Sequence, residues 1–417
     1  MTMITDSEAT TKWSVAALGF AIIFLDGFDT ALLPLLLPTL SPLWHVEPKA
    51  FAVPLTITNI GAVAGFVASG WLASRFDPKR VLVFGCAWFG VWTLLTGFIL
   101  HLQSMPLLAS VRLLTGFGLG VVLPTAIGLA TRHGAKRHQA TISVLVTLGL
   151  GTGAAVCGFL GGMLVRNFGP EGCFLFGGIF PLLVAALAQA ILPASPAAEN
   201  FTRRNRNQAG LAELFEPNHR WTTILLWVFS FSIFVAYYTL SNWIPALLIG
   251  FGFAPTEAPL GLGFFSIGAV VGGIALLGLV RLFDIRPLLV LMCAVSAAFI
   301  VLLVKTESGH GLLLAFLAGA GFGIVAGQIG QLTLAVLTYP EAARTTGVGW
   351  AAALGRCGSI VGPAVGGALL SLGLDGKSIV LAMLVPLLLA GAIAAILWNL
   401  DMRSKPTEAW PKHVDIG

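Results

Sequence analysis

Twelve long apolar segments dominate the sequence and limit what the chain can fold into. Each approaches or exceeds the roughly 20 residues that a helix needs to cross a hydrocarbon core of about 30 Å. Lipid offers no partner to backbone N–H and C=O groups, so segments of this length must satisfy these groups internally as helices. The sequence therefore predicts an all-α membrane protein with transmembrane helices near 14–36, 51–74, 81–101, 106–130, 141–165, 172–192, 222–249, 258–280, 287–304, 311–338, 346–372 and 378–399.

The composition excludes an ordinary soluble domain. Hydrophobic residues make up 57% of the chain and charged residues only 10%, whereas about a quarter of a typical soluble protein is charged. The net charge of +5 raises the possibility of a nucleic-acid partner. The basic residues lie in short loops between apolar segments, however, which is the pattern of membrane topology and not of a binding patch. No nucleic-acid partner is expected.

The longest polar interval divides the helices six and six. We therefore predict an N-terminal six-helix bundle at 1–192, a cytoplasmic linker at 193–220 and a C-terminal six-helix bundle at 221–417. Similar short sequences follow the second helix of each half, at 70–75 and 278–283. This repetition predicts two pseudo-symmetric bundles, an arrangement that places a substrate site between the halves near the middle of the membrane.

The distribution of basic residues predicts the orientation of the chain. With both termini in the cytoplasm, most Lys and Arg residues fall in cytoplasmic segments, as the positive-inside rule requires. Only four then lie in outer loops: Lys49, Arg166, Lys305 and Lys377.

Four charged residues lie within the predicted spans: Asp26, Asp29, Arg112 and Arg356. A charge at the bilayer centre costs at least about 2.5–3.5 kcal/mol, so such residues pair with one another or line a wet cavity. From the rise of 1.5 Å per residue, Asp26 and Asp29 lie roughly 18 and 22 Å from the cytoplasmic face, and Arg112 roughly 21 Å. Arg356 lies roughly 15 Å in, at mid-membrane.

These depths lead to a hypothesis of proton coupling. The Asp26, Asp29 and Arg112 side chains share a level and are predicted to handle protons, and Arg356 is predicted to hold a substrate carboxylate. An anion that engages an arginine weakens its hold on an aspartate and favours proton uptake there. This coupling needs the proton gradient and no metal or cofactor. The roles of the two aspartates stay open, and the alternative is that these charges only fix helix packing.

Further polar and aromatic side chains within the spans are candidates for substrate binding. Gln328 and Gln331 stand three residues apart on one helix, and either a substrate or a neighbouring helix can be their hydrogen-bond partner. Asn59 and Asn242 have the same two interpretations. Aromatic side chains that could stack on a substrate ring, or simply lie at the membrane interface, include Phe28, Tyr238 and Trp350.

Several motifs resemble one family. They are Asp26-Gly27-Phe28-Asp29-Thr30, the run from Arg112 to Gly120, Asn242-Trp243-Ile244-Pro245, and Arg344-Thr345-Thr346-Gly347 with Gly355-Arg356. Together they resemble the aromatic acid:proton symporters of the major facilitator superfamily, which include hydroxybenzoate, hydroxyphenylpropionate and muconate transporters. The loop after the second helix departs from the superfamily pattern, because Ser74 stands where an acidic residue is usual. The residues that form the cytoplasmic gate are therefore not predicted.

The resemblance implies a secondary transporter and not an enzyme. It implies import of an aromatic or related organic carboxylate by proton symport. The transporter would be a monomer in the inner membrane of a bacterial cell, and its substrate would enter the catabolism of aromatic compounds. It also implies that Asp26, Asp29, Arg112 and Arg356 are needed for transport.

Two other functions compete with this interpretation. A proton-driven exporter on the same fold usually carries G-x-x-x-G-P-x-x-G-G in the fifth helix, whereas here that pattern occurs between Gly358 and Gly367, in the eleventh. A membrane sensor would need a soluble domain, and no segment of the sequence provides one.

Overall fold

A computed structural model of the chain describes residues 11–135, 138–192, 214–216, 220–306, 309–339 and 341–404. Within these ranges every regular element is a helix, and eleven of the helices are long and apolar enough to cross a membrane. The predicted linker at 193–220 lies outside the described residues, apart from Leu214–Glu216 and Arg220.

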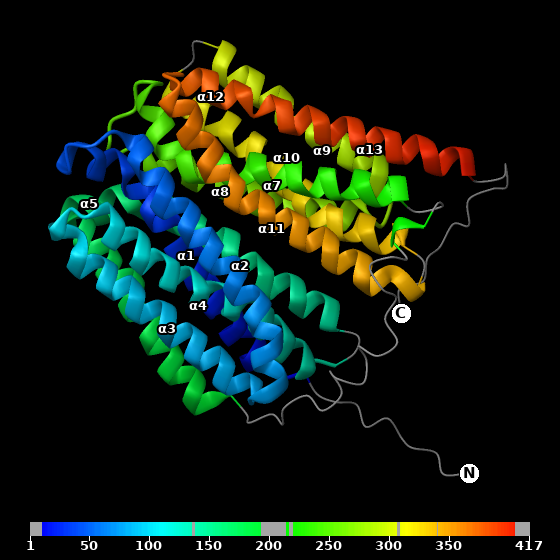
Figure 1. The fold of residues 1–417 in the computed structure, drawn as a ribbon, viewed down its shortest axis with the longest axis horizontal. Helices are drawn as coiled ribbons and strands as arrows, with labels where there is room; N and C mark the ends of the chain where they lie inside the picture. The colour runs from blue at the N-terminus through cyan, green and yellow to red at the C-terminus, as the bar shows by residue number, and fades with distance from the viewer. Residues whose placement is uncertain are drawn as a thin grey trace.

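The first half of the chain contains five long helices, α1 to α5, whose arrangement can be followed in Figure 1. Short 3-10 turns, η1 and η2, separate some of them. The elements are α1 (Trp13–Leu43), η1 (Pro48–Phe51), α2 (Ala52–Arg75), α3 (Pro78–Ile99), η2 (Leu100–Leu102), α4 (Met105–Arg132) and α5 (Gln139–Ile191).

The long element α5 contains two membrane spans. At 1.5 Å per residue its 53 residues would extend about 80 Å, far more than one bilayer. Gly169 breaks the helix with φ 68° and ψ 176°, a conformation that glycine adopts readily, and Pro170 follows it. Before the break α5 runs parallel to α1, since Gly19 faces Val146 and Gly161 faces Leu35.

After the break α5 runs antiparallel to α3. Gly97 lies against Glu171 and Gly90 against Gly178, so the order of contacts is reversed. The chain therefore turns back at Gly169, and the prediction of separate fifth and sixth spans is confirmed.

The second half of the chain repeats this arrangement. Its elements are α7 (Arg220–Ile249), α8 (Pro259–Leu279), α9 (Ile285–Lys305), α10 (His310–Thr338), α11 (Glu341–Ser371), α12 (Gly376–Ala382) and α13 (Leu384–Ser404). The last two helices make one span, Gly376–Leu400. With α5 counted twice, twelve spans result, as the apolar segments predict.

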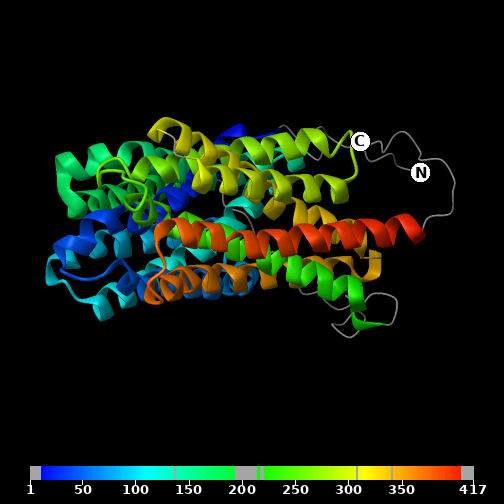
Figure 2. The same ribbon diagram turned by 90° about the horizontal axis from the view of Figure 1, so that it is seen from above.

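The helices form two bundles with matching contacts. In the first bundle α1 packs on α5, α2 on α4, and α3 on both α4 and α5. In the second bundle α7 packs on α11, α8 on α10, and α9 on both α10 and α13. Figure 1 shows the blue-to-green first bundle beside the green-to-red second one, and Figure 2 shows from above that the helices of both bundles run along the same long axis. The bundles meet where α1 packs on α7, α2 on α11 and α5 on α8.

Glycine allows very close contact between helix backbones within each bundle. A Cβ atom added to Gly268 of α8 would lie 1.9 Å from the carbonyl oxygen of Ala318 in α10. No side chain fits in that space, so the two helices contact each other through their backbones. Small residues at such contacts are typical of helix pairs in membranes.

We expect Gly268→Ala to destabilise the second bundle, because its new methyl group requires α8 and α10 to separate. Overpacking of this kind costs about 1–3 kcal/mol. The matched control is Gly128→Ala in α4, where an added Cβ meets nothing within 4 Å. Thermal unfolding of the detergent-solubilised protein should show a lower midpoint for Gly268→Ala only. An unchanged midpoint for that variant would contradict the described contact.

Candidate functional site

A buried ion pair joins α1 to α4. Arg112 donates from one guanidinium nitrogen to Asp29 Oδ2 at 3.1 Å and from the other to Oδ1 at 3.4 Å. The exposed fraction is 0% for the Asp29 side chain and 1% for Arg112. Each charge thus has its partner inside the protein, which offsets part of the cost of removing both from water. The predicted pairing of an acid with a base at this depth is present in the structure.

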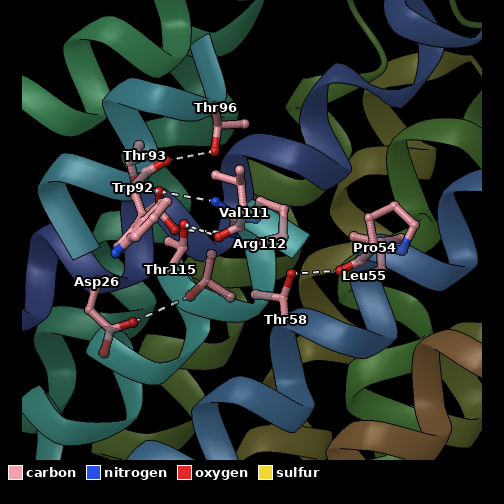
Figure 3. A network of polar contacts seen from close by, with 12 residues as sticks. Asp26, Pro54, Leu55, Thr58, Trp92, Thr93, Thr96, Val111, Arg112 and Thr115 are labelled. Carbon is pink, nitrogen blue, oxygen red and sulfur yellow. Dashed lines mark hydrogen bonds and ion pairs between the residues drawn. The ribbon is translucent and has the colours of Figure 1, made fainter. Parts of the chain in front are cut away.

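A threonine completes the surroundings of Asp29. Thr93 of α3 donates its hydroxyl proton to Asp29 Oδ1 at 2.5 Å. Figure 3 shows Thr93 and Arg112 close together in this network. Three helices, α1, α3 and α4, therefore converge on one carboxylate. Its oxygens are occupied by fixed donors, and it lies behind the wall of the adjacent cavity.

Asp26 has a different environment, although it lies only three residues before Asp29. Its carboxylate accepts one hydrogen bond, from the hydroxyl of Thr30 at 3.3 Å. No ion pair with Asp26 is present among the residues described. Its side chain lines a cavity and is only 5% exposed. The structure thus separates the two aspartates into a paired one and a cavity-facing one.

The cavity lies between the two bundles. Its empty space amounts to about 940 Å³, part of it open to solvent. The first bundle contributes side chains from α1, α2, α4 and α5, and the second bundle contributes side chains from α7, α8 and α11. Both charged and aromatic side chains line it, including Asp26, Phe66, Tyr237, Tyr238 and Arg356.

Two arginines reach this cavity, and only one is paired. Arg112 is neutralised by Asp29. Arg356 of α11 makes no side-chain hydrogen bond or ion pair with any residue that the structure describes. Its guanidinium carbon lies 5.0 Å from the centre of the Phe66 ring in α2, so the cation rests on an aromatic face supplied by the other bundle. Arg356 is therefore the free cation of the cavity.

Aromatic and amide groups form the rest of the polar wall. Tyr237 and Tyr238 meet edge to face at 5.0 Å between ring centres, and Tyr238 also stacks on Phe234 at 6.1 Å. Asn59 of α2 and Asn242 of α7 line the cavity from opposite bundles. The ordered rings offer flat apolar faces, and the amides offer hydrogen-bonding groups.

Four of the predicted substrate-binding residues lie away from this cavity. Gln331 is 1% exposed and accepts a hydrogen bond from Ser230 of α7. Of the two hydrogen-bond partners considered for it, a substrate or a neighbouring helix, the structure shows the neighbouring helix. The amide nitrogen of Gln328 is buried with no partner among the described residues. Trp350 stacks on Trp227 at 5.6 Å, and Phe28 packs against the apolar core. Of the seven predicted, Tyr238, Asn242 and Arg356 line the cavity.

Sequence reasoning did not single out Phe66. It is one of 28 phenylalanines, and no local motif distinguishes it from those that face lipid. Asp77, in the loop that departs from the superfamily pattern, accepts a hydrogen bond from the Lys79 backbone at 3.0 Å and caps α3.

Residues 19–355 match the profile of the Major Facilitator Superfamily. The chain belongs to this superfamily. It is 30% identical to the 3-(3-hydroxy-phenyl)propionate transporter of Escherichia coli strain K12, covering 93% of this chain and 94% of that one.

Other relatives agree with this assignment. The chain is 29% identical to the 4-hydroxybenzoate transporter PcaK of Pseudomonas aeruginosa, covering 91% of each chain. Among solved structures, a bacterial homologue of the human lysosomal transporter Spinster has a TM-score of 0.74 at 14% identity. The match covers 96% of this chain and 99% of that one. That likeness concerns the fold alone and confirms the predicted major facilitator architecture.

We expect the Asp29–Arg112 pair to behave as one unit in unfolding. Removing one partner of a buried pair leaves an uncompensated charge and costs about 3–5 kcal/mol, whereas replacing both with apolar residues is often nearly neutral. Asp29→Leu and Arg112→Met should each lower the thermal midpoint strongly, and the double variant should recover most of the loss. Additive losses in the double variant would show that the two side chains are not coupled.

Proposed function

We propose that this protein imports an aromatic carboxylate together with protons by alternating access. The observation that carries the proposal is Arg356, an unpaired cation in a cavity lined by aromatic rings from both bundles. The names of its relatives support an aromatic acid as the substrate. Export of drugs or metabolites is not favoured, since these relatives are named as transporters of aromatic acids.

The proposed place for the substrate carboxylate is the Arg356 guanidinium. Its fork of N–H donors matches the two oxygens of a carboxylate, and no acidic side chain among the described residues occupies it. The ring of the substrate would lie against the tyrosines Tyr237 and Tyr238. Arg112 is a poor alternative, because Asp29 already neutralises its charge through both terminal guanidinium nitrogens.

Asp26 is the proposed carrier of the coupled proton. In the empty cavity the negative charge of Asp26 and the positive charge of Arg356 balance each other. A substrate carboxylate bound to Arg356 removes that balance, and a proton on Asp26 restores it. Because an uncompensated charge is costly in a low-dielectric cavity, anion and proton would bind together and leave together. The Asp29–Arg112 pair then serves as a fixed support beside Asp26.

We place the protein as a monomer in the inner membrane of a bacterium, with both termini in the cytoplasm, since the basic residues concentrate in the loops on that side. The bundles at 1–192 and 221–417 would rock about the cavity, joined by the linker at 193–220. The proton gradient would be the energy source, with no cofactor.

We expect uptake of labelled 4-hydroxybenzoate or 3-(3-hydroxyphenyl)propionate into proteoliposomes with an imposed inward pH gradient. Arg356→Gln should raise the KM at least about tenfold, because a charged hydrogen bond to the carboxylate is lost. Arg356→Lys should recover part of the loss. The matched control is Arg281→Gln, an exposed arginine in the turn after α8. Absence of gradient-stimulated uptake of any organic acid would refute the proposed function.

We expect Asp26→Asn to abolish the coupling of transport to protons while the variant still binds and exchanges substrate. The amide cannot exchange a proton, so we expect no accumulation driven by the pH gradient. Exchange of internal for external labelled acid at equal pH should persist. Glu257→Gln serves as a control, because this carboxylate is exposed and is not among the residues that line the cavity. If Asp26→Asn still concentrates substrate, Asp26 does not carry the coupled proton.

A further inference from the structure

Two asparagines, one from each bundle, line the cavity on the same side of Arg356. Along α2, Phe66 lies beside the Arg356 guanidinium, and Ala52 lies against Gly367 of α11. Asn59 lies between these two positions of α2. It precedes Phe66 by seven residues. This separation is two helical turns, so the two side chains lie on the same face of α2, about 10 Å apart along the helix axis.

Asn242 occupies a corresponding place on α7. This helix runs parallel to α11, since Gly355 lies against Phe234 and Gly366 against Trp243. Asn242 is next to Trp243 and thus lies well beyond the level of Arg356, toward the same end of the molecule as Asn59. The cavity therefore has a cationic end at Arg356 and an amide end at the two asparagines.

The hydrogen bonds of both amides fix which atoms they present. Asn59 Nδ2 donates to the Leu55 carbonyl oxygen at 3.0 Å. Asn242 Nδ2 donates to the Tyr238 carbonyl oxygen at 2.8 Å. A carbonyl oxygen can only accept, so the NH2 group of each amide must face it, and Oδ1 must point elsewhere. No described residue donates to either Oδ1 atom. The amide end of the cavity thus presents acceptors that lack a donor.

We propose that Asn59 and Asn242 bind a hydroxyl group on the substrate ring, on the far side from the carboxylate. This inference rests on the proposed function and names its substrate class more closely as hydroxylated aromatic monocarboxylates. The phenolic O–H supplies the donor that the Oδ1 atoms lack. A second carboxylate at this end would place negative charge against these acceptor oxygens, so dicarboxylates are disfavoured.

The inference makes a prediction about ring isomers. In 4-hydroxybenzoate the hydroxyl lies opposite the carboxylate and can reach the amide end while the carboxylate binds Arg356. In 2-hydroxybenzoate it adjoins the carboxylate and bonds to it internally. A site that hydrogen-bonds a substrate hydroxyl rejects an analogue without one, because its own polar groups are left unpaired.

A competition assay in proteoliposomes tests this hydroxyl site. Unlabelled acids compete there with the uptake of labelled 4-hydroxybenzoate and 3-(3-hydroxyphenyl)propionate. Unlabelled 4-hydroxybenzoate and 3-(3-hydroxyphenyl)propionate should compete at least about tenfold better than benzoate, 3-phenylpropionate, 2-hydroxybenzoate or benzene-1,4-dicarboxylate. Asn59→Leu and Asn242→Leu should reduce this ratio toward one by weakening the hydroxylated acids, with little change for benzoate. Asn167→Leu, in the exposed region before Gly169, should leave the ratio unchanged.

The outcomes separate the two proposals. Uptake of all these acids with no preference for a ring hydroxyl in the wild-type protein would overturn the inference and leave the proposed function intact. Preserved preference in both leucine variants would overturn it as well. Failure to transport any aromatic acid would overturn both. The wild-type ratio needs no variant, so the inference stays testable even if a leucine substitution prevents folding.

Discussion

The cost of placing charge in an apolar medium governs the centre of this molecule. Asp29 and Arg112 are almost completely buried, and each is tolerable only because the other is within hydrogen-bond distance. Their contact holds α1 against α4. Asp26, three residues earlier on α1, lines the cavity between the bundles together with Arg356 and pairs with no described base. The Asp29–Arg112 pair carries no net charge, whereas the charged groups of Asp26 and Arg356 border the cavity itself.

Much of the fold follows from the sequence alone, because lipid imposes a simple constraint on length. Each apolar segment of about 20 residues predicts one span, and the Gly169-Pro170 pair lies where the fifth and sixth spans separate. The pairing of an acid with a base inside the membrane could also be predicted, since four charges in so apolar a chain are easily recognised.

The direction in which each side chain points could not be predicted. A soluble helix carries an apolar stripe that identifies its buried face, but helices surrounded by lipid and other helices are apolar on every side. Asp26 and Asp29 share a face of α1 by their spacing, yet they have separate surroundings. Gln331 and Trp350 likewise contact neighbouring helices instead of the cavity, and Phe66 supports Arg356 from the other bundle. These distinctions depend on how the helices are rotated and on contacts between distant segments.

The backbone contact at Gly268 has a consequence for how this protein can change over generations. A larger residue at a position where even one methyl group is too large destabilises the bundle, so selection for stability keeps the relative placement of α8 and α10 constant. The cavity wall carries no such restriction at Asn59, Tyr238 or Asn242, where side chains border open space. With the substrate bound at these residues as we propose, its preference can drift through a few substitutions while the scaffold that moves the substrate stays the same.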